Sequence, residues 1–299
     1  MDLWQLHIFC KVVELKSFSK AGGAVYLSQP TVSSHIKDLE ESTGCKLIDR
    51  LPKEALPTRA GELLFGYAKK LLLLRDEAES ALAEFQGTIR GCLTIGGSSI
   101  PGVYILPRIV GMYIRTFPEV KISLSLGDTG STIDKIMSGE LELGVVGALS
   151  EGGGLDQEEV FEDAMRLIVP ASHRWAGKGA VSLEDLQKEP FIIRERGSGT
   201  LKSIQRNFDR MGRSIRKLNI ASEMGSTEAV LQAIKAEAGV SILSSLAVSE
   251  DVSAGRLKVL NICGVDLTQR FYATKLKNRT PSPLCKSFFE FLKTNITGF

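Results

Sequence analysis

The chain has 299 residues, of which 43% are hydrophobic and 24% are charged, as is ordinary for a globular protein with room for two or three domains. The formal net charge is only +2, so overall charge gives no argument for nucleic-acid binding and the arrangement of residues has to supply one. The most apolar short run, residues 71–74, is far below the roughly 20 residues of a membrane span, and residues 1–5 lack an export signal. We therefore expect a cytoplasmic protein with no membrane partner.

Two short amphipathic helices are predicted at the start of the chain. Apolar residues recur at intervals of three and four over residues 2–15, which is the spacing of one buried helix face. The same spacing over residues 18–25 predicts a second helix, for which Ser17 or Ser19 is the N-cap.

The next predicted helix, residues 27–40, has the features of a DNA recognition helix. Ser28 caps its first turn, and Pro30 lies in that turn, where a backbone N–H would have no partner in any case. Apolar residues at i, i+4 and i+7, from Val32 to Leu39, share one face and leave short polar side chains and one lysine on the other. Such a face suits base edges and phosphates in a major groove, although an ordinary solvated face is the alternative. The candidate DNA-binding residues in and around this helix are Lys20, Ser28, Gln29, Pro30, Thr31, Ser33, Ser34, His35, Lys37, Arg50 and Lys53.

A hairpin wing is predicted after this helix. Gly44 suits the residue that ends the helix, and short apolar segments on both sides of Pro52 suit two strands. Arg50 and Lys53 would then lie beside DNA phosphates, where cations fix the register of a protein on the duplex rather than its sequence preference.

A long helix follows, capped by Thr58 and running to about Ile89. Its apolar residues alternate at intervals of four and three from Ala60 to Phe85, which is the a/d spacing of a coiled coil. So strict a repeat favours a partner helix over packing on the same domain, and two copies would double the number of DNA half-sites. The predicted dimer seam includes Leu64, Tyr67, Leu71, Leu74, Ala78 and Phe85.

From Gly91 onward the pattern becomes strand, glycine-rich turn and helix, repeated along the chain. This alternation predicts an α/β domain with a parallel sheet and with ligands at the carboxyl ends of the strands. The repeats fall into two lobes joined by two crossings, which would form a hinged clamp around a cleft. We therefore place a DNA-binding domain at residues 1–58, a linker helix at 59–90 and an effector-binding domain at 91–299, with lobe I at 91–162 and 266–299 and lobe II at 163–265.

The strongest candidate for a ligand site is the turn at residues 194–200, between a predicted strand and a predicted helix. Gly197 and Gly199 let successive backbone N–H groups converge, and the helix start adds positive potential, which suits a small anion. Residues 98–100 would close the pocket from the other lobe, and a plain surface turn is the alternative. The candidate effector-binding residues are Ser98, Ser99, Ile100, Arg196, Gly197, Ser198, Gly199 and Thr200.

The sequence shows no pattern typical of catalysis. The five cysteines are scattered and form no CxxC pair, which is typical of reduced thiols, while a redox role stays open. The three histidines lie far apart, so neither a zinc site nor a His-based triad is indicated. We expect no enzyme activity, no cofactor and no metal.

The N-terminal residues resemble those of LysR-type transcriptional regulators. The family pattern F-S-x-A-A-x-x-L-x-x-S-Q-P-A-V-S-x-x-I-x-x-L-E matches residues 18–40, with Gly22, Val25 and Thr31 in place of Ala, Leu and Ala. Residues 47–50 continue the match as L-F-x-R. The resemblance covers the whole chain and implies a winged helix-turn-helix, a long linker helix and a two-lobed α/β effector domain like that of periplasmic binding proteins.

The resemblance also implies the partners. They are double-stranded promoter DNA, a homodimer or homotetramer, and a small effector in the cleft, with contact to RNA polymerase left open. It adds Gly147 to the candidate effector residues. Residues 194–200 and 223–229 resemble members that sense sulfur oxyanions and also the carbon-fixation regulators. A sulfur or selenium oxyanion is therefore the first expectation, and a small organic or phosphorylated acid is the second.

A small-molecule carrier is the competing hypothesis, because the two C-terminal lobes also resemble transport-binding proteins. The lack of an export signal, together with the predicted wing and heptad repeat, favours the regulator.

Overall fold

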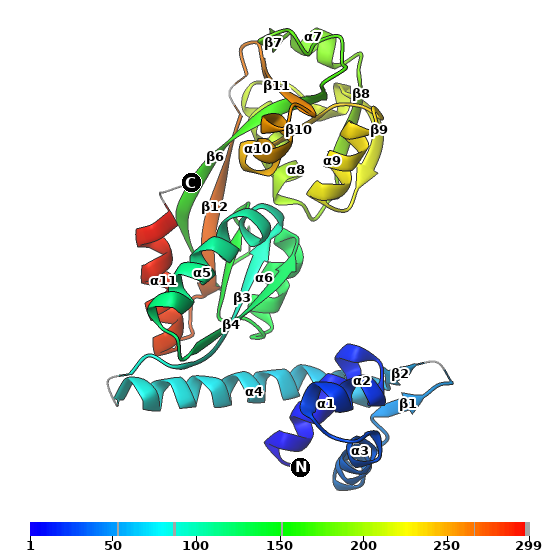
Figure 1. Cartoon of the computed structure of the whole chain (residues 1–299), viewed down its shortest axis with the longest axis vertical. Helices are drawn as coiled ribbons and strands as arrows, with labels where there is room; N and C mark the ends of the chain where they lie inside the picture. The colour runs from blue at the N-terminus through cyan, green and yellow to red at the C-terminus, as the bar shows by residue number, and fades with distance from the viewer. Residues whose placement is uncertain (53, 86–87, 151, 266, 297–299) are drawn as a thin grey trace. The chain divides into compact units, whose positions relative to one another are not determined.

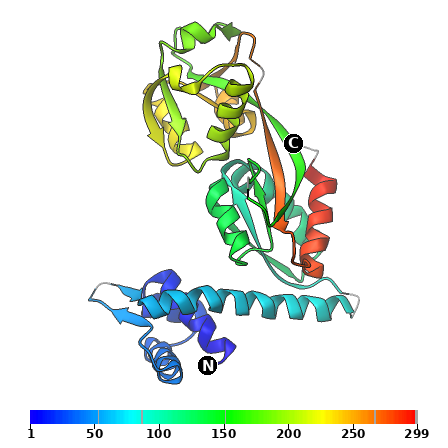
Figure 2. The same ribbon diagram turned by 180° about the vertical axis from the view of Figure 1, so that it is seen from behind.

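The computed structural model of the protein describes residues 1–52, 54–85, 88–150, 152–265 and 267–296, without the side chains of Ser80 and Glu84. The chain divides into two compact units, Met1–Thr88 and Ile89–Phe299 (Figure 1 and Figure 2). Each unit has its own buried core. The finer domain limits at residues 58 and 90 stay a prediction.

Three helices, α1 (Leu3–Leu15), α2 (Phe18–Val25) and α3 (Gln29–Thr43), form the core of the first unit. Their apolar faces meet in one cluster, and the side chains at its centre are fully enclosed. The apolar face predicted for the recognition helix is part of this cluster, which includes Phe9, Val12, Val32, Ile36 and Leu39.

Serine side chains start two of these helices. The Ser17 hydroxyl accepts the N–H of Lys20 at 3.3 Å, which decides between the two predicted caps of α2. The Ser28 hydroxyl accepts the N–H of Thr31 at 3.3 Å and caps α3 as predicted. Each cap satisfies a backbone donor that has no partner within its own helix.

Gly22 in α2 faces the turn that leads to α3. A Cβ atom on Gly22 would lie 2.6 Å from the carbonyl oxygen of Leu27, which is closer than carbon and oxygen approach without a shift of the backbone. The N–H of Leu27 also donates to the carbonyl of Gly22 at 2.9 Å. The glycine therefore lets the turn pack tightly on α2, at a position where the LysR-type pattern has alanine.

The wing and a long helix complete the first unit. β1 (Ile48–Arg50) and β2 (Ala55–Pro57) pair antiparallel. α4 (Arg59–Phe85) follows at once, and the Thr58 hydroxyl caps it by accepting a backbone N–H at 3.0 Å. The first turns of α4 pack on the core of this unit, whereas many apolar side chains farther along the helix are exposed.

The second unit alternates strands and helices along the chain. Its strands are β3 (Gly91–Ser98), β4 (Val120–Gly127), β5 (Leu143–Val146), β6 (Leu155–Pro170), β7 (Ala180–Val181), β8 (Pro190–Arg194), β9 (Asn219–Met224), β10 (Ser241–Ser244), β11 (Leu257–Ile262) and β12 (Leu267–Leu276). Its α-helices are α5 (Leu106–Thr116), α6 (Thr129–Met137), α7 (Leu183–Leu186), α8 (Gly199–Arg210), α9 (Thr227–Lys235), α10 (Ser245–Ser253) and α11 (Pro283–Asn295), and a π-helical turn, Pro101–Ile105, leads into α5. No helix in the described part of the chain is both long and apolar enough to span a bilayer.

The main sheet of this unit has eight strands in the order β4-β3-β5-β12-β6-β11-β7, with β10 paired to β6. The prediction of a parallel sheet is wrong. β3 is parallel to β4 and β5, but β6 and β12 run antiparallel to every strand with which they pair. The chain passes back through the same sheet in each of these two strands, so each runs in the opposite direction to its neighbours.

β6 and β12 connect two lobes (Figure 1). Lobe I contains β3, β4 and β5 with α5, α6 and α11, and its core is built around Tyr113 and Phe288. Lobe II contains β8 and β9 with α8 and α9, and a second core surrounds Phe191 and Phe208. β6 begins at Leu155 and continues without a break to Pro170.

Candidate DNA interface and effector site

The face of α3 opposite the buried cluster is open to solvent. Lys37 provides the positive charge of this face, and the ammonium nitrogen of Lys37 lies 3.4 Å from the Glu41 carboxylate. This ion pair is exposed, so it contributes little to stability and leaves the lysine able to turn toward a phosphate. The exposed candidate residues on α3 are Gln29, Pro30, Thr31, Ser34 and Lys37.

Arg50 of the wing is held against α2 and α3. Its Nη1 donates to the Ser33 hydroxyl at 2.8 Å, and its guanidinium carbon lies 4.6 Å from the centre of the Phe18 ring. Both contacts orient an exposed cation toward the same side of the unit as the start of α3. Lys20 is exposed on α2 and His35 is half-buried on α3.

Lys53, the remaining predicted contact, lies outside the described residues. The sequence placed Arg50 beside DNA, but it gave no signal for the ring of Phe18 beneath the guanidinium, because the two residues are far apart in the chain.

α4 exposes apolar side chains along most of its length. Tyr67, Leu74 and Phe85 of the predicted seam expose 60%, 58% and 93% of their surface, whereas Leu64 packs on the core of its own unit. Side chains of this size in one row on a helix indicate a surface that a partner covers. The other exposed apolar residues of α4 are Leu63, Leu71, Ala78, Ala81 and Leu82.

The predicted effector turn packs directly against lobe I. A Cβ atom on Gly199 would lie 2.6 Å from the Thr129 hydroxyl and 3.0 Å from the backbone of Gly147, and one on Gly197 would lie 2.0 Å from the Asp128 carboxylate. The Thr129 hydroxyl also accepts the N–H of Gly147 at 3.3 Å. The start of α8 therefore meets the start of α6, and glycines alone allow the two lobes to approach so closely.

The hydroxyls predicted to hold an anion are buried within this contact. Ser198 caps α8 by accepting the N–H of Leu201 at 3.4 Å. The Thr200 hydroxyl donates to the Gln269 side-chain oxygen at 3.3 Å. Ser98, Ile100, Gly147 and Gly199 are also buried, whereas Arg196 is exposed. Of the candidates, Gly197, Gly199 and Gly147 meet at the contact between the lobes, and Ser198 and Thr200 are the chain neighbours of Gly199.

Arg194, the last residue of β8, bridges the lobes and is only 3% exposed. Its Nε and Nη2 donate to the two carboxylate oxygens of Glu195 at 2.8 and 2.7 Å. Nη1 donates to the Thr227 hydroxyl at 2.6 Å, and Nη2 also donates to the Ser99 hydroxyl of lobe I at 3.0 Å. The sequence included Arg194 in the candidate turn but gave no indication of these partners.

A cavity of about 570 Å³ opens beside Arg194, and its lining is acidic. Asp128, Glu195 and Glu228 line it, while the only lining cation among the described residues is Arg194, which already binds Glu195. Burial, and then the nearby Glu228, raises the pKa of Tyr104 in the same wall. Of the predicted effector residues Ser99 lines this cavity. Such a lining disfavours an anion. Among the described side chains as a whole, no group of three or more His, Cys, Asp or Glu residues could hold a metal ion.

Two family models match the chain. Residues 3–62 match the bacterial regulatory helix-turn-helix protein of the LysR family, and residues 86–297 match the LysR substrate binding domain. The chain belongs to the LysR family. It is a DNA-binding transcriptional regulator with an effector-binding domain, and the α/β architecture predicted for it, with an N-terminal helix-turn-helix and two C-terminal lobes, is confirmed.

Relatives of this LysR-family chain extend over nearly its full length. The uncharacterized HTH-type transcriptional regulator MJ0300 of Methanocaldococcus jannaschii is 31% identical to this chain, over 95% of this chain and 96% of the length of MJ0300. A probable RuBisCO transcriptional regulator of Trichormus variabilis is 30% identical over 95% of this chain and 85% of its own. The regulatory domain of CcmR from Synechocystis PCC6803, solved in complex with 2-PG, covers 70% of this chain and 98% of its own at 25% identity, with a TM-score of 0.63.

The contacts of Arg194 predict a large contribution to stability. Arg194→Ala removes the donor to the buried Thr227 hydroxyl, to the half-buried Ser99 hydroxyl and to the Glu195 carboxylate, so we expect the free energy of unfolding to fall by about 3 kcal/mol. Arg196→Ala is the matched control, since its side chain is exposed and the change should stay within about 0.5 kcal/mol. Urea unfolding of both variants measures the difference, and equal stabilities would contradict the role assigned to Arg194.

Proposed function

We propose that this LysR-type regulator binds promoter DNA as a dimer or tetramer through α3 and the wing, and that a small anion between its two lobes alters transcription. The observation that carries the proposal is the open polar face of α3 with the fixed cation of Arg50 beside it. Small hydroxyl and amide groups reach base edges in a major groove, and a guanidinium beside them binds phosphate. Contact with RNA polymerase stays open.

Substitution of Ser34 tests the DNA face. Ser34 is exposed and faces solvent, so Ser34→Glu adds a carboxylate that repels the phosphates without disturbing the core. Ser33 is less suitable, because a glutamate there would meet Arg50. We expect the Kd for a duplex from the promoter beside its own gene to rise at least about tenfold in fluorescence anisotropy.

Ser42→Glu is the control, since it adds the same charge to the far end of the same helix and should leave the Kd nearly unchanged. If both variants bind as the original protein does, α3 is not the recognition helix.

The dimer proposal rests on the apolar row of α4. Tyr67, Leu74 and Phe85 are exposed at the spacing of a coiled-coil seam, and their burial against a second copy of the helix would remove a large apolar area from water. A pair of recognition helices would then read two half-sites, which one copy could not.

Aspartates in this row should separate the subunits. Leu71→Asp combined with Leu74→Asp places two carboxylates in the seam, where their desolvation opposes association. We expect the mass from light scattering to fall to that of one chain. Leu51→Asp in the wing, another exposed leucine of the first unit, should leave the mass unchanged. A dimer that persists in the double variant would place the interface elsewhere.

The effector proposal rests on the glycine contact between the lobes. Backbone N–H groups at the start of α8 and the hydroxyls of Ser198 and Thr200 would face an anion if the lobes moved apart, since Gly147 and Gly199 present only backbone there. β6 and β12 are the connections about which such a movement would turn. A sulfur or selenium oxyanion and a small organic or phosphorylated acid are the chemical classes that suit such a turn, and the 2-PG complex of the CcmR domain favours the second class.

Thermal unfolding of the full chain with sulfate, selenate and 2-PG tests the effector site. At least one of these ligands should raise the Tm in a saturable way, because a ligand that binds only the folded state stabilises it. Ser198→Ala with Thr200→Ala should reduce the shift, while Ser249→Ala with Thr294→Ala should leave it unchanged. A shift that the first double substitution leaves unchanged, or no shift with any of the three, would contradict the proposed site.

A further inference from the structure

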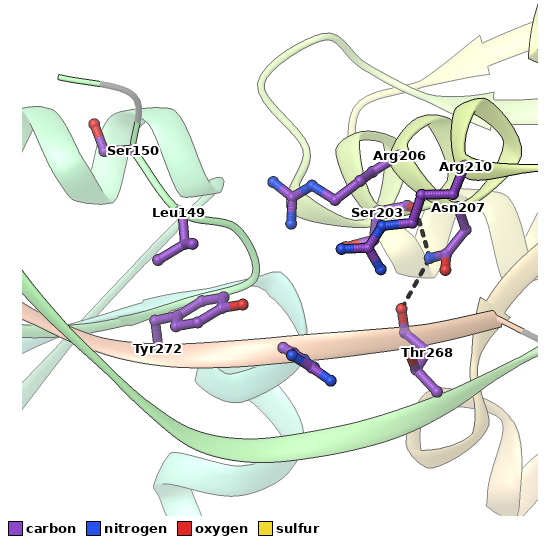
Figure 3. A pocket seen from close by; sticks show the side chains of 9 residues that line it. Leu149, Ser150, Ser203, Arg206, Asn207, Arg210, Thr268 and Tyr272 are labelled. Carbon is purple, nitrogen blue, oxygen red and sulfur yellow. Dashed lines mark hydrogen bonds between the residues drawn. The ribbon is translucent and has the colours of Figure 1, made fainter.

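A second cavity lies between the lobes and has the opposite charge. Its volume is about 470 Å³, and Figure 3 shows how its labelled side chains are arranged. One wall is a face of α8 with residues at i, i+3, i+4 and i+7, the floor comes from β12, and lobe I contributes the segment after β5. The lining residues are Leu149, Ser150, Ser203, Arg206, Asn207, Arg210, Thr268, Arg270 and Tyr272.

Two of the three arginines that line this cavity have no charged partner among the described residues. Arg206 and Arg210 extend from α8 over the floor in Figure 3. Both are exposed, and neither makes a hydrogen bond or an ion pair with any residue that the structure describes. Arg270 is paired with Glu162 at 2.9 Å and Glu159 at 3.5 Å. None of the lining residues is acidic, so two guanidinium charges remain uncompensated.

The remaining polar groups of the wall are fixed. The Asn207 amide donates to the carbonyls of Ser203 at 2.8 Å and Thr268 at 3.1 Å, which ties α8 to β12. The Ser203 hydroxyl donates to the carbonyl of Gly147 in lobe I at 3.4 Å. The Tyr272 hydroxyl, which points along the floor in Figure 3, has no partner among the described residues. The cavity therefore offers two free guanidinium groups and one free hydroxyl on a rigid base.

We propose that this cavity is a second anion site, distinct from the effector turn, and that it binds a small phosphorylated molecule. Two planar guanidinium groups can each donate two charge-assisted hydrogen bonds to phosphate oxygens, which suits a multiply charged anion. None of the candidate effector residues lines the cavity. The volume is that of a site for a small metabolite rather than for a bare ion.

A ligand in this site contacts both lobes. Arg206 and Arg210 belong to lobe II, whereas Leu149 and Ser150 belong to lobe I, so a bound anion favours the arrangement that holds the two segments together. Ligand binding in this cavity therefore also alters the relative position of the two lobes, independently of an anion bound at the start of α8.

Titration of the full chain with inorganic pyrophosphate tests the site. Isothermal calorimetry should give one site per chain, and Arg206→Gln with Arg210→Gln should raise the Kd at least about tenfold, because two charge-assisted contacts are lost. Arg213→Gln with Arg216→Gln removes the same charge from exposed positions just beyond α8 and should leave the Kd within about twofold. Equal losses in the two double variants, or none in the first, would overturn the proposal.

Two further variants separate this site from the others. Ser150→Glu introduces a carboxylate from lobe I and should weaken pyrophosphate binding, and an unchanged Kd would remove lobe I from the site and overturn the proposal. Ser198→Ala with Thr200→Ala should leave the Kd for pyrophosphate unchanged, whereas a higher Kd in this variant would assign the anion to the effector turn instead. Ser34→Glu should bind pyrophosphate with an unchanged Kd, and a higher Kd in that variant would assign pyrophosphate to the DNA face.

Discussion

The antiparallel pairing of β6 and β12 is the constraint on which the effector domain depends. The two strands pair from Leu155 opposite Leu276 to Met165 opposite Leu267, with one register shift between Phe271 and Tyr272. Both lobes attach to this pair, since β5 joins one side of β12 and β10 and β11 join β6. The position of one lobe relative to the other therefore depends on how these strands twist, so a change in the twist would alter the contacts between the lobes.

The two openings between the lobes differ in the chemistry that they present. The cavity beside Arg194 is lined by Asp128, Glu195 and Glu228, while the cavity on α8 carries Arg206 and Arg210, which have no partner in the part of the chain that the structure describes. Gly147 of lobe I and Gly199 of lobe II meet at a close backbone contact and line neither cavity. A single domain thus offers one acidic and one basic surface to ligands, which is a basis for discriminating between them by charge.

Local spacing predicted the parts of the fold that depend on neighbours in the chain. The face from Val32 to Leu39 and the caps Ser28 and Thr58 follow from helix periodicity and from side-chain hydrogen bonds a few residues away. The sequence does not predict the start of β6, because residues 155–163 contain six acidic or polar side chains and three apolar ones that do not alternate with them. The hydrogen bonds of Arg194 to Thr227 and Ser99, like the two cavities, join residues that are remote in sequence, and no local pattern encodes them.

The position of Arg50 has a consequence for the thermodynamics of complex formation. A free arginine loses roughly 2 kcal/mol of rotamer entropy when its side chain becomes ordered. Arg50 rests on the Phe18 ring and donates to Ser33 before any nucleic acid arrives, so most of that freedom is already lost in the isolated protein. In the proposed complex, a contact of Arg50 with phosphate carries a smaller entropic penalty, and a flexible lysine at the same place would lack this advantage.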